Sequence, residues 1–587
     1  MPFPDDPLAR ELFEAGGREL ADRYDAELGL VRQVTDQGSW HSPRDSLWHA
    51  LCLLLAGDDV AEAERAIRQV LTMQERRDGD PHRGNFRWLY EDENVTDLNS
   101  VEFVLEGLTN VLHRAADRLS DAMRGEIDGA MRLAFEEVDR LDVHWTYTNI
   151  YLLDVHNSIL GGELLGDGAL VDRGVRRLRE WAVRTKADGA PHEFNSATYS
   201  AVQINALAGI VGLAKSDEAR TLALEMEELL WRHVARHFHV PTLQLAGPHS
   251  RAYRRDVVGA PDFLKVLLYR LLGEPRLLAP TPYYEGPGRE GSVIAGLTEY
   301  HCPPDARELF ARVETREVRE CADRAAGMEL TTYLTPEFAL GSMTRPYGVG
   351  EPPEVWPAHN SCILYYAKEQ EPRYGVLYCR YLVNDRRVGQ FVYESSREAL
   401  DLWEEGSFRT AQHRGDAIVA YGLLPRGQRP VHSLRLDVRV LGIDGASEVF
   451  AGGRRYEGGE LALDAPAVVG FADGAVYIGV RVLEPARLGH EPPVVLWRDG
   501  QETVLSVYNY RGPAKQFWEY RSLAGPFYKG NVRNGAVIRV AARTDHASLE
   551  AFLDGLAQEP LTDGLSGSIR TVAFGGAILE YDLRELR

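Results

Sequence analysis

Four polar segments in the first half of the chain concentrate side chains that can hold an anion or transfer a proton. They are HRGNFRWLYEDENVTDLNSVEF (82–103), HWTYTNIYLLDVHN (144–157), DGAPHEFNSATYSAV (188–202) and AGPHSRAYRRD (246–256). Tyr and His can act as general acids and bases, and Asn, His and Arg can hydrogen-bond a carboxylate. A single Asn or His at a helix start is usually only a cap. The clustering of four such segments is therefore what indicates a binding cleft.

The candidate site residues all come from these segments. The catalytic candidates are Tyr199, Asn149, His192, Asn195 and His249, and the substrate-binding candidates are Arg251, Tyr253, His144, Tyr147, Arg87 and Glu193. Each segment begins or ends an expected helix, so all four are expected at the same mouth of a helical fold. Arg83, Arg87, Arg251 and Arg254 are expected to make that mouth basic, since a local charge can oppose the global one.

The elements that must position these residues are paired helices. Leu47, Leu51 and Leu54 recur at helical spacing before Gly57, and AEAERAIRQVLTMQ starts the next helix. Comparable joints occur at 120–121, 166–167 and 216–217, where Ser, Gly and Asp provide the caps that helix ends require. Helical hairpins therefore recur roughly every 45 to 55 residues, as in stacked helix-pair folds. We favour an (α/α) toroid over an open solenoid, whose repeats would be shorter and more uniform.

The pattern changes from about Ala279. One more helix is expected at 303–318, and short alternating apolar runs follow after Leu330, with Asp473-Gly474 and Asp499-Gly500 as turn signals. The expected strands include 363–367, 374–383, 388–395, 416–424, 434–443, 467–472, 475–484, 493–499, 536–544 and 571–576. This pattern predicts an antiparallel β-sandwich. The predicted fold class is thus α+β and multidomain, with an incomplete (α/α) toroid as the catalytic domain at 1–330 and the sandwich at 331–587.

Two of the polar segments resemble a known family. DGAPHEFNSATYSAVQINALAGIV and NIYLLDVHNSILGGELLGD are similar to stretches of alginate-lyase and heparinase II/III-type polysaccharide lyases, which join an (α/α) toroid to an antiparallel sandwich. The resemblance gives Tyr199 the position of the catalytic Tyr and Asn149 that of the catalytic Asn. Ile150 follows Asn149, where the family commonly has His.

The resemblance implies β-elimination from a 4-linked uronic acid in an oligosaccharide or polysaccharide. This reaction removes the proton at C5 and expels the oxygen at C4, while hydrogen bonds to the carboxylate accommodate the developing charge. Asn149 and Asn195 suit the carboxylate, Tyr199 suits the acid or base, and His192 or His249 suits the partner base. Arg251 is a candidate carboxylate clamp because its planar fork can bind bidentately.

Two other classes of function remain open from the sequence. An inverting glycoside hydrolase would place two carboxyl groups about 6.5–9.5 Å apart, with Glu193, Asp97 or Glu102 as candidates. A non-catalytic carbohydrate-binding protein would use the aromatic loops only to stack sugars. Fold class alone does not decide among the three.

Composition narrows the partners. The 587 residues carry a formal charge of -22, which argues against nucleic-acid binding because that needs a basic face. No nucleotide-binding glycine motif is found, and we expect no cofactor and no metal. His233 and His237 lie one helical turn apart, but the sequence identifies no third ligand, so we interpret the pair as structural.

Location is likewise an expectation from the sequence. No signal peptide and no membrane-spanning apolar run are seen, and the five cysteines are sparse and unpaired in pattern. We therefore expect a cytoplasmic protein with reduced thiols and no membrane partner. Its expected partner is a uronate-containing oligosaccharide, with a homo-oligomer as a possibility left open.

Overall fold

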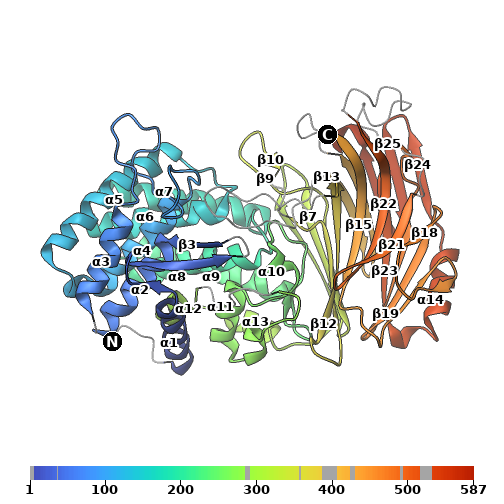
Figure 1. The fold of residues 1–587 in the computed structure, drawn as a ribbon, viewed down its shortest axis with the longest axis horizontal. Coiled ribbons are helices and arrows are strands. Elements are labelled where there is room, and N and C mark those ends of the chain that lie inside the picture. Colours follow the sequence, from blue (N-terminus) through green and yellow to red (C-terminus); the bar gives the residue numbers. More distant parts are fainter. Residues whose placement is uncertain are drawn as a thin grey trace.

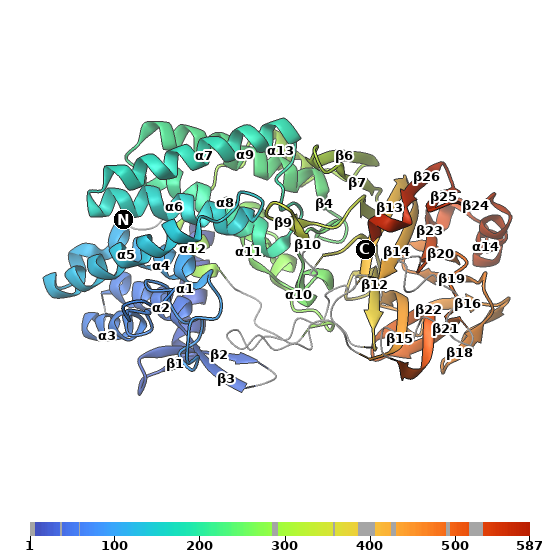
Figure 2. The ribbon, with the colours of Figure 1, turned by 90° about the horizontal axis from the view of Figure 1, so that it is seen from above.

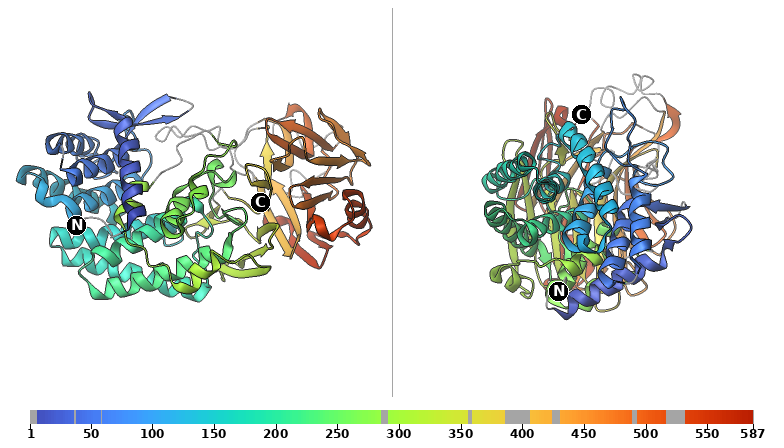
Figure 3. Two further views of the ribbon diagram at one scale, coloured as in Figure 1. Left: turned by 90° about the horizontal axis from the view of Figure 1, so that it is seen from below. Right: turned by 90° about the vertical axis from the view of Figure 1, so that its left-hand side faces the viewer.

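The structure is a computed structural model that describes residues 6–35, 38–57, 59–284, 291–355, 359–385, 406–423, 430–488, 493–515 and 532–586. A helical half and a sheet-rich half lie at opposite ends of the long axis (Figures 1 and 3). The predicted order of helices followed by antiparallel sheets is therefore confirmed. No helix of the described ranges is long and apolar enough to cross a membrane.

The helical half has an inner and an outer layer, visible from above in Figure 2. The inner helices, each packed on the next, are α2 (Pro43–Ala56), α4 (Ser100–Ala115), α6 (Thr148–Leu165), α8 (Ala197–Leu213) and α11 (Phe263–Leu272). The outer helices, each paired with the inner helix before it in the chain, are α3 (Val60–Leu71), α5 (Asp121–Leu141), α7 (Gly168–Asp188) and α9 (Asp217–His237). Helices α1 (Pro7–Asp22) and α12 (Ser292–Leu297) pack on each other between α11 and α2. The helical hairpins thus curve into the predicted (α/α) toroid.

Local capping explains the joints between hairpins. The side chains of Ser120, Asp167 and Ser216 accept backbone N–H bonds at the starts of α5, α7 and α9. Gly57 and Gly166 end α2 and α6 in the left-handed conformation, which costs glycine little. Inner helices α6 and α8 are buried on nearly every face, whereas the outer helices keep one exposed face. The inner layer is therefore where buried polar groups need partners.

The helical half also contains short strands and helices. They are β1 (Tyr24–Asp25), β2 (Leu30–Thr35) and β3 (Gly38–Ser42) in one sheet, β4 (Phe238–His239) and β5 (Gln244–Leu245) in another, and the helices α10 (Arg254–Val257) and α13 (Pro304–Leu309). The expected helix over 303–318 is wrong in its second half. It ends at Leu309, and strand β6 already begins at Arg316, before the predicted domain boundary at residue 330.

Two antiparallel sheets form the second half. The nine-stranded sheet has the order β18 (Leu461–Leu463), β21 (Val494–Asp499), β22 (Glu502–Lys515), β15 (Val431–Leu441), β12 (Tyr374–Val383), β11 (Cys362–Ala367), β8 (Phe338–Met343), β7 (Met328–Leu334) and β6 (Arg316–Asp323). The seven-stranded sheet has the order β13 (Gly406–His413), β14 (Asp416–Leu423), β23 (Asn534–Ala542), β20 (Val476–Val482), β19 (Val468–Asp473), β16 (Glu448–Ala451) and β17 (Arg454–Arg455). The expected strand at 388–395 lies outside the described residues.

Further elements cover the outer face of the seven-stranded sheet. They are β24 (Thr562–Ser566), β25 (Ile569–Phe574), β26 (Ala577–Asp582) and helix α14 (Leu549–Gln558). A two-stranded ribbon of β9 (Gly348–Val349) and β10 (Glu354–Val355) follows β8 and extends toward the helices (Figure 2).

The central strands of the nine-stranded sheet, β8, β11, β12 and β15, are buried on both faces. In β12, Tyr374, Val376 and Tyr378 pack with residues 252–260 of the helical half. Leu377 and Cys379 alternate with them and pack against the seven-stranded sheet. Successive side chains of a strand point to opposite faces, so this one strand joins the helical half to the sandwich core.

The loop after β5 is held by that junction. Tyr365 Oη donates to the carbonyl oxygens of Asp256 (3.0 Å) and Val257 (2.9 Å), and Tyr374 Oη donates to that of Val258 (2.9 Å). The sheet therefore fixes the backbone that follows Arg251 and Tyr253, two of the predicted site residues.

Candidate functional site

The starts of inner helices α6 and α8 bring the central residues together. Asn149 is the second residue of α6, and Tyr199 is the third residue of α8. Glu193 and Asn195 lie in the loop that precedes α8, and Arg251 lies in the loop before α10. These residues all come from the predicted polar segments, and all are buried.

Glu193 is the hub of the site. Its carboxylate accepts the backbone N–H of Asn149 (2.8 Å), the Asn149 side-chain amide (2.8 and 2.9 Å) and Arg251 Nη1 (2.9 Å). Gln203 Nε2 lies 3.4 Å from the same carboxylate. Tyr147, the residue before α6, makes no side-chain cap bond to that helix. Glu193 thus caps α6 from another segment, where the helix dipole also favours a negative charge.

Arg251 connects this hub to a tyrosine cluster. Its Nη2 donates to Tyr199 Oη at 2.8 Å, and its guanidinium lies 3.8 Å from the Tyr199 ring centre and 5.2 Å from that of Tyr147. Tyr199 Oη also hydrogen-bonds Tyr253 Oη, and Asn99 Nδ2 donates to Tyr147 Oη at 3.0 Å. The Arg251 guanidinium can stabilise a phenolate, and the hydrogen-bonded phenols of Tyr199 and Tyr253 can relay a proton.

Burial dominates the acid–base properties of these phenols. It raises the pKa of Tyr199 well above the usual value, against the opposing effect of Arg251. Burial also raises the pKa of Tyr147. Removal from water disfavours the charged phenolate, so Tyr199 is protonated at neutral pH.

Asn195 is strained and lacks a partner for its side chain. Its φ is 42°, in the left-handed region that non-glycine residues seldom adopt. Ser250 fixes one neighbour by bonding the Phe194 carbonyl oxygen, and Ser196 caps α8 on the other side. The side chain is fully buried, and neither of its polar atoms is hydrogen-bonded by any described residue. Such a group is expensive unless a ligand completes it.

The sheet-rich half contributes to the site as well. His192 Nε2 donates to the Gly348 carbonyl oxygen at 3.0 Å, and the His192 ring lies 5.4 Å from that of Tyr347. Tyr347 Oη donates to the carbonyl oxygen of Thr146, and burial raises the Tyr347 pKa. The remaining nitrogen of His192, Nδ1, has no hydrogen bond in the described part of the chain and lies 3.8 Å from Asp323 Oδ2. Nδ1 therefore carries the lone pair that His192 can offer to a ligand.

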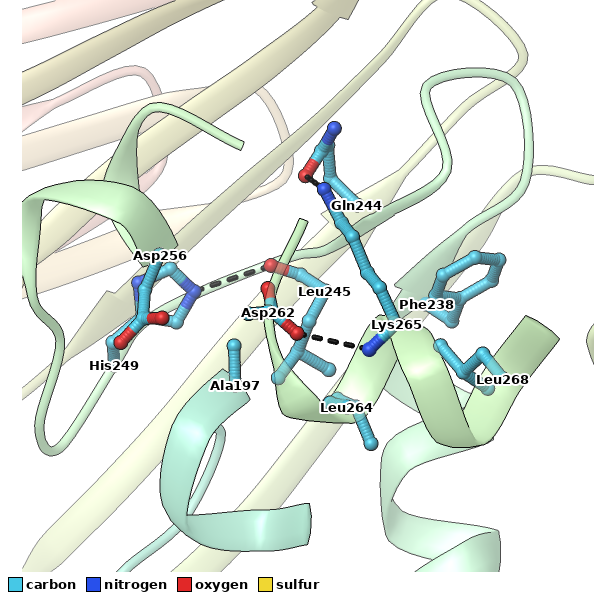
Figure 4. Close-up of a pocket in the computed structure, with 10 residues that line it drawn as sticks. All are labelled: Ala197, Phe238, Gln244, Leu245, His249, Asp256, Asp262, Leu264, Lys265 and Leu268. Carbon is cyan, nitrogen blue, oxygen red and sulfur yellow. Dashed lines mark hydrogen bonds between the residues drawn. The ribbon is translucent and has the colours of Figure 1, made fainter. Parts of the chain in front are cut away.

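The prediction that His249 acts as a base disagrees with the structure. His249 Nε2 bonds the Leu245 carbonyl oxygen at 3.1 Å, in the wall of a small cavity that Lys265 and Asp262 also line (Figure 4). Its Nδ1 lies 3.1 Å from Asn360 Nδ2, and the two backbones pair in a β-bridge. Burial lowers the His249 pKa to about 4. Both nitrogens are thus engaged, and His249 joins the helical half to the sheets.

The expected basic mouth is also wrong. Arg251 is paired with Glu193, Arg254 lies 3.5 Å from Glu502 and Arg83 lies 3.2 Å from Glu136. Arg87 Nη1 donates to the carbonyl oxygens of Tyr90 (2.7 Å) and Asp92 (2.8 Å). Arg251, Arg254 and Arg83 thus each have a carboxylate nearby, and Arg87 shapes its own loop through carbonyl oxygens.

The other predicted residues lie around the tyrosine cluster. His144 is half-buried, its Nδ1 lies 2.8 Å from Thr146 Oγ1, and burial lowers its pKa. Tyr253 is partly exposed beside Tyr199, with its backbone N–H bonded to Asp256. These two residues lie toward the rim, where they are able to meet a ligand.

Two residues of the site were not predicted. Gln203 lies one turn after Tyr199 on α8, so the i, i+4 spacing of a helix offered a signal for it. Tyr347 comes from beyond the predicted boundary at residue 330, and the sequence contains no local pattern that points to it. Non-local packing of the two halves alone brings it in.

The carboxyl groups proposed for hydrolysis differ in environment. Glu193 is fully buried and held by Arg251 and Asn149. Glu102 is buried between α4 and α6, where Asn157 bonds it and burial raises its pKa. Asp97 is partly exposed, and burial raises its pKa against the nearby charge of Arg251. Of the three, Asp97 alone combines access with a raised pKa.

Comparisons with known proteins give a distant likeness. Residues 10–285 match a family described as "Domain of unknown function (DUF8769)", and a search of the curated proteins finds no match. The chain is similar to a crystal structure of heparinase III, with TM-score 0.40 and 10% identity over 92% of this chain and 82% of that one. It is also similar to heparan sulfate lyase HepC from Pedobacter heparinus, with TM-score 0.33 and 8% identity over 99% and 90% of the two chains. The chemistry of the site therefore has to follow from its own residues.

Proposed function

We propose that this chain is a carbohydrate-active lyase that cleaves uronate-containing oligosaccharides or polysaccharides by β-elimination. The observation that supports the proposal is the Tyr199–Arg251–Tyr253 cluster, in which a protonated phenol is held between a guanidinium and a second phenol. Beside it, a strained and unpartnered Asn195 amide offers hydrogen bonds to a carboxylate.

In the proposed reaction, the substrate carboxylate binds the Asn195 amide, which stabilises the charge that develops as C5 is deprotonated. His192 Nδ1 takes the C5 proton, the electrons of the C5–H bond form the C4–C5 double bond, and the C4–O bond breaks. Tyr199 Oη gives its proton to the departing oxygen, and Arg251 stabilises the phenolate that remains. Tyr199 regains a proton and His192 loses one through solvent, which restores the starting state.

The proposal changes the role first given to Asn149. Its side-chain amide already bonds both carboxylate oxygens of Glu193, so we assign Asn149 to holding Glu193 and Arg251 in place. The carboxylate-binding role moves to Asn195. In the described residues, Asn149 Oδ1 has no partner and is buried, which suits acceptance of a hydrogen bond from a sugar hydroxyl.

The test combines product analysis with one conservative variant. A panel of uronate and neutral polysaccharides is incubated with the full chain, and the ultraviolet absorbance of the unsaturated uronate is followed. Tyr199→Phe should reduce the rate at least about 100-fold, as loss of a general acid does. Tyr381→Phe is the matched control, because it also removes one buried hydroxyl, bonded to Asn509 at 2.8 Å inside the sandwich. Full turnover by a folded Tyr199→Phe variant would refute the assignment.

Two other outcomes would select the alternatives. New reducing ends without the unsaturated product would favour a hydrolase, with Asp97 as its acid because of its raised pKa. Binding without any turnover on the whole panel would favour a carbohydrate-binding protein.

A further inference from the structure

A second cluster of side chains, which can bind a metal ion or transfer a proton, lies at the junction of α9 and β6, outside the tyrosine cluster. His233 and His237 occupy successive turns of α9, and Glu320 lies on β6. His233 Nδ1 is 2.6 Å and His237 Nε2 is 3.2 Å from the same carboxylate oxygen, Glu320 Oε2. All three side chains are at most 6% exposed. Their ligand atoms all lie within 4.8 Å of one another.

The hydrogen bonds around His237 determine which of its nitrogens carries a lone pair. Thr332 Oγ1 donates its single hydrogen to the Gly247 carbonyl oxygen at 2.7 Å. The Thr332 oxygen therefore accepts from His237 Nδ1, which lies 2.8 Å away. In the neutral ring, Nε2 is then an acceptor that faces a second acceptor, the Glu320 oxygen. Two lone pairs at 3.2 Å need a positive charge between them, either a proton or a metal ion.

Metal-binding histidines usually have the same hydrogen-bond arrangement. Such a residue donates its other ring N–H to a fixed acceptor, which sets the tautomer and the ring orientation. Thr332 has this role for His237, and Thr332 is itself fixed by Gly247 at the base of the loop that carries Arg251. The hydrogen bonds of Thr332 thus connect the cluster to the backbone of both halves.

The spacing suits a tetrahedral ion. Ligand atoms about 2.0–2.2 Å from Zn²⁺ are separated by about 3.3 Å. The His237–Glu320 pair already has this spacing at 3.2 Å, and the His233–Glu320 pair has to open from 2.6 Å. Arg236 Nη1 bonds the other oxygen, Oε1, at 2.5 Å. It therefore leaves Oε2 to the ion and orients the carboxylate.

We propose that His233, His237 and Glu320 form a binding site for a divalent transition-metal ion of the Zn²⁺ type, which links helix α9 to the first strand of the nine-stranded sheet. Two imidazole nitrogens and one carboxylate oxygen are a donor set that Zn²⁺ favours, with a fourth position for water. No third ligand for the histidine pair was identifiable from the sequence. Strand β6 supplies it as Glu320, 83 residues after His237. This site does not depend on the proposed lyase reaction.

The test uses the full chain after treatment with a chelator. Zn²⁺ is titrated by calorimetry, and Co²⁺ is titrated by visible absorbance, which reports tetrahedral nitrogen and oxygen coordination. We expect one equivalent of each ion to bind and the Tm to rise by several degrees, because a ligand that binds only the folded state stabilises it. Absence of Zn²⁺ uptake at micromolar concentration by the folded chain would overturn the proposal.

Matched variants separate this site from adventitious histidines. His237→Gln and Glu320→Gln should each lose the Co²⁺ spectrum and the Tm increase. His239→Gln and Glu317→Gln are the controls: His239 is buried with both ring nitrogens bonded to Thr242 and Thr335, and Glu317 lies on the same strand as Glu320. Both controls should bind like the unchanged chain. Equal uptake by His237→Gln, or equal loss in the controls, would also contradict the assignment.

Discussion

Replacement of Glu193 by Gln is the strongest test of how the site is held together. The carboxylate accepts three hydrogen bonds of 2.8–2.9 Å from the Asn149 backbone, the Asn149 amide and Arg251. Gln keeps one acceptor oxygen but places an NH₂ group against donors, and it leaves the Arg251 guanidinium buried without its counter-charge. Removing one partner of a buried ion pair costs about 3–5 kcal/mol. We expect the free energy of unfolding to fall by that amount.

Urea unfolding followed by circular dichroism measures this loss, as a lower midpoint with an unchanged slope. Glu106→Gln is the matched control. Glu106 is equally buried and bonded to Asn205 at 3.1 Å, and burial raises its pKa, so its charged form is less favoured than that of an exposed carboxyl group. That variant should lose only about 1 kcal/mol. The double variant Glu193→Gln/Arg251→Gln should recover part of the loss, since no unpaired charge remains. A cost below about 1 kcal/mol for Glu193→Gln would refute the view that this ion pair anchors the site.

Two further predictions concern strain and acid stability. Asn195→Gly should leave stability unchanged or raise it by up to about 1 kcal/mol, because glycine tolerates the positive φ, yet turnover should fall at least tenfold with the lost amide. Unchanged turnover of the glycine variant would assign Asn195 a structural role only. Burial lowers the pKa of His156 to about 4, so the unfolded chain binds a proton below about pH 6.5 that the folded chain does not. This group should therefore cost about 1 kcal/mol of stability between pH 6.5 and 5.5. His156→Gln should remove that part of the pH dependence in denaturant titrations, and an unchanged slope would contradict the calculation.

Local sequence signals were sufficient for the helical hairpins. Helix starts and ends depend on neighbouring residues, so Ser120, Asp167 and Gly166 mark the joints in the sequence as they do in the structure. The same signals placed the polar segments at the starts of inner helices, and this explains why Asn149 and Tyr199 lie in one site. Their positions follow from the repeat of hairpins around the toroid.

Partners from distant parts of the chain were not predictable. His249 had the residue type and position of a base, but its function is set by Asn360, 111 residues away. Arg251 was expected to clamp a substrate, and its ion pair with Glu193 was not predicted. Charge compensation of this kind leaves no periodic pattern in the sequence, because each partner satisfies its own local rule as a cap or a loop residue.

The two halves therefore depend on each other at the site, although the sequence predicts two successive domains. Arg251 and Tyr253 lie in a loop whose backbone is bonded by Tyr365 and Tyr374 of the nine-stranded sheet. On the opposite side, His192 donates to a carbonyl oxygen of the β9 ribbon. The toroid supplies the helix starts, and the sheet supplies the groups that fix the loops between them. Because hydrogen bonds and packing of this junction fix the loops that carry Arg251, Tyr253 and His192, a change at the sheet surface can alter the geometry of the site without touching these side chains.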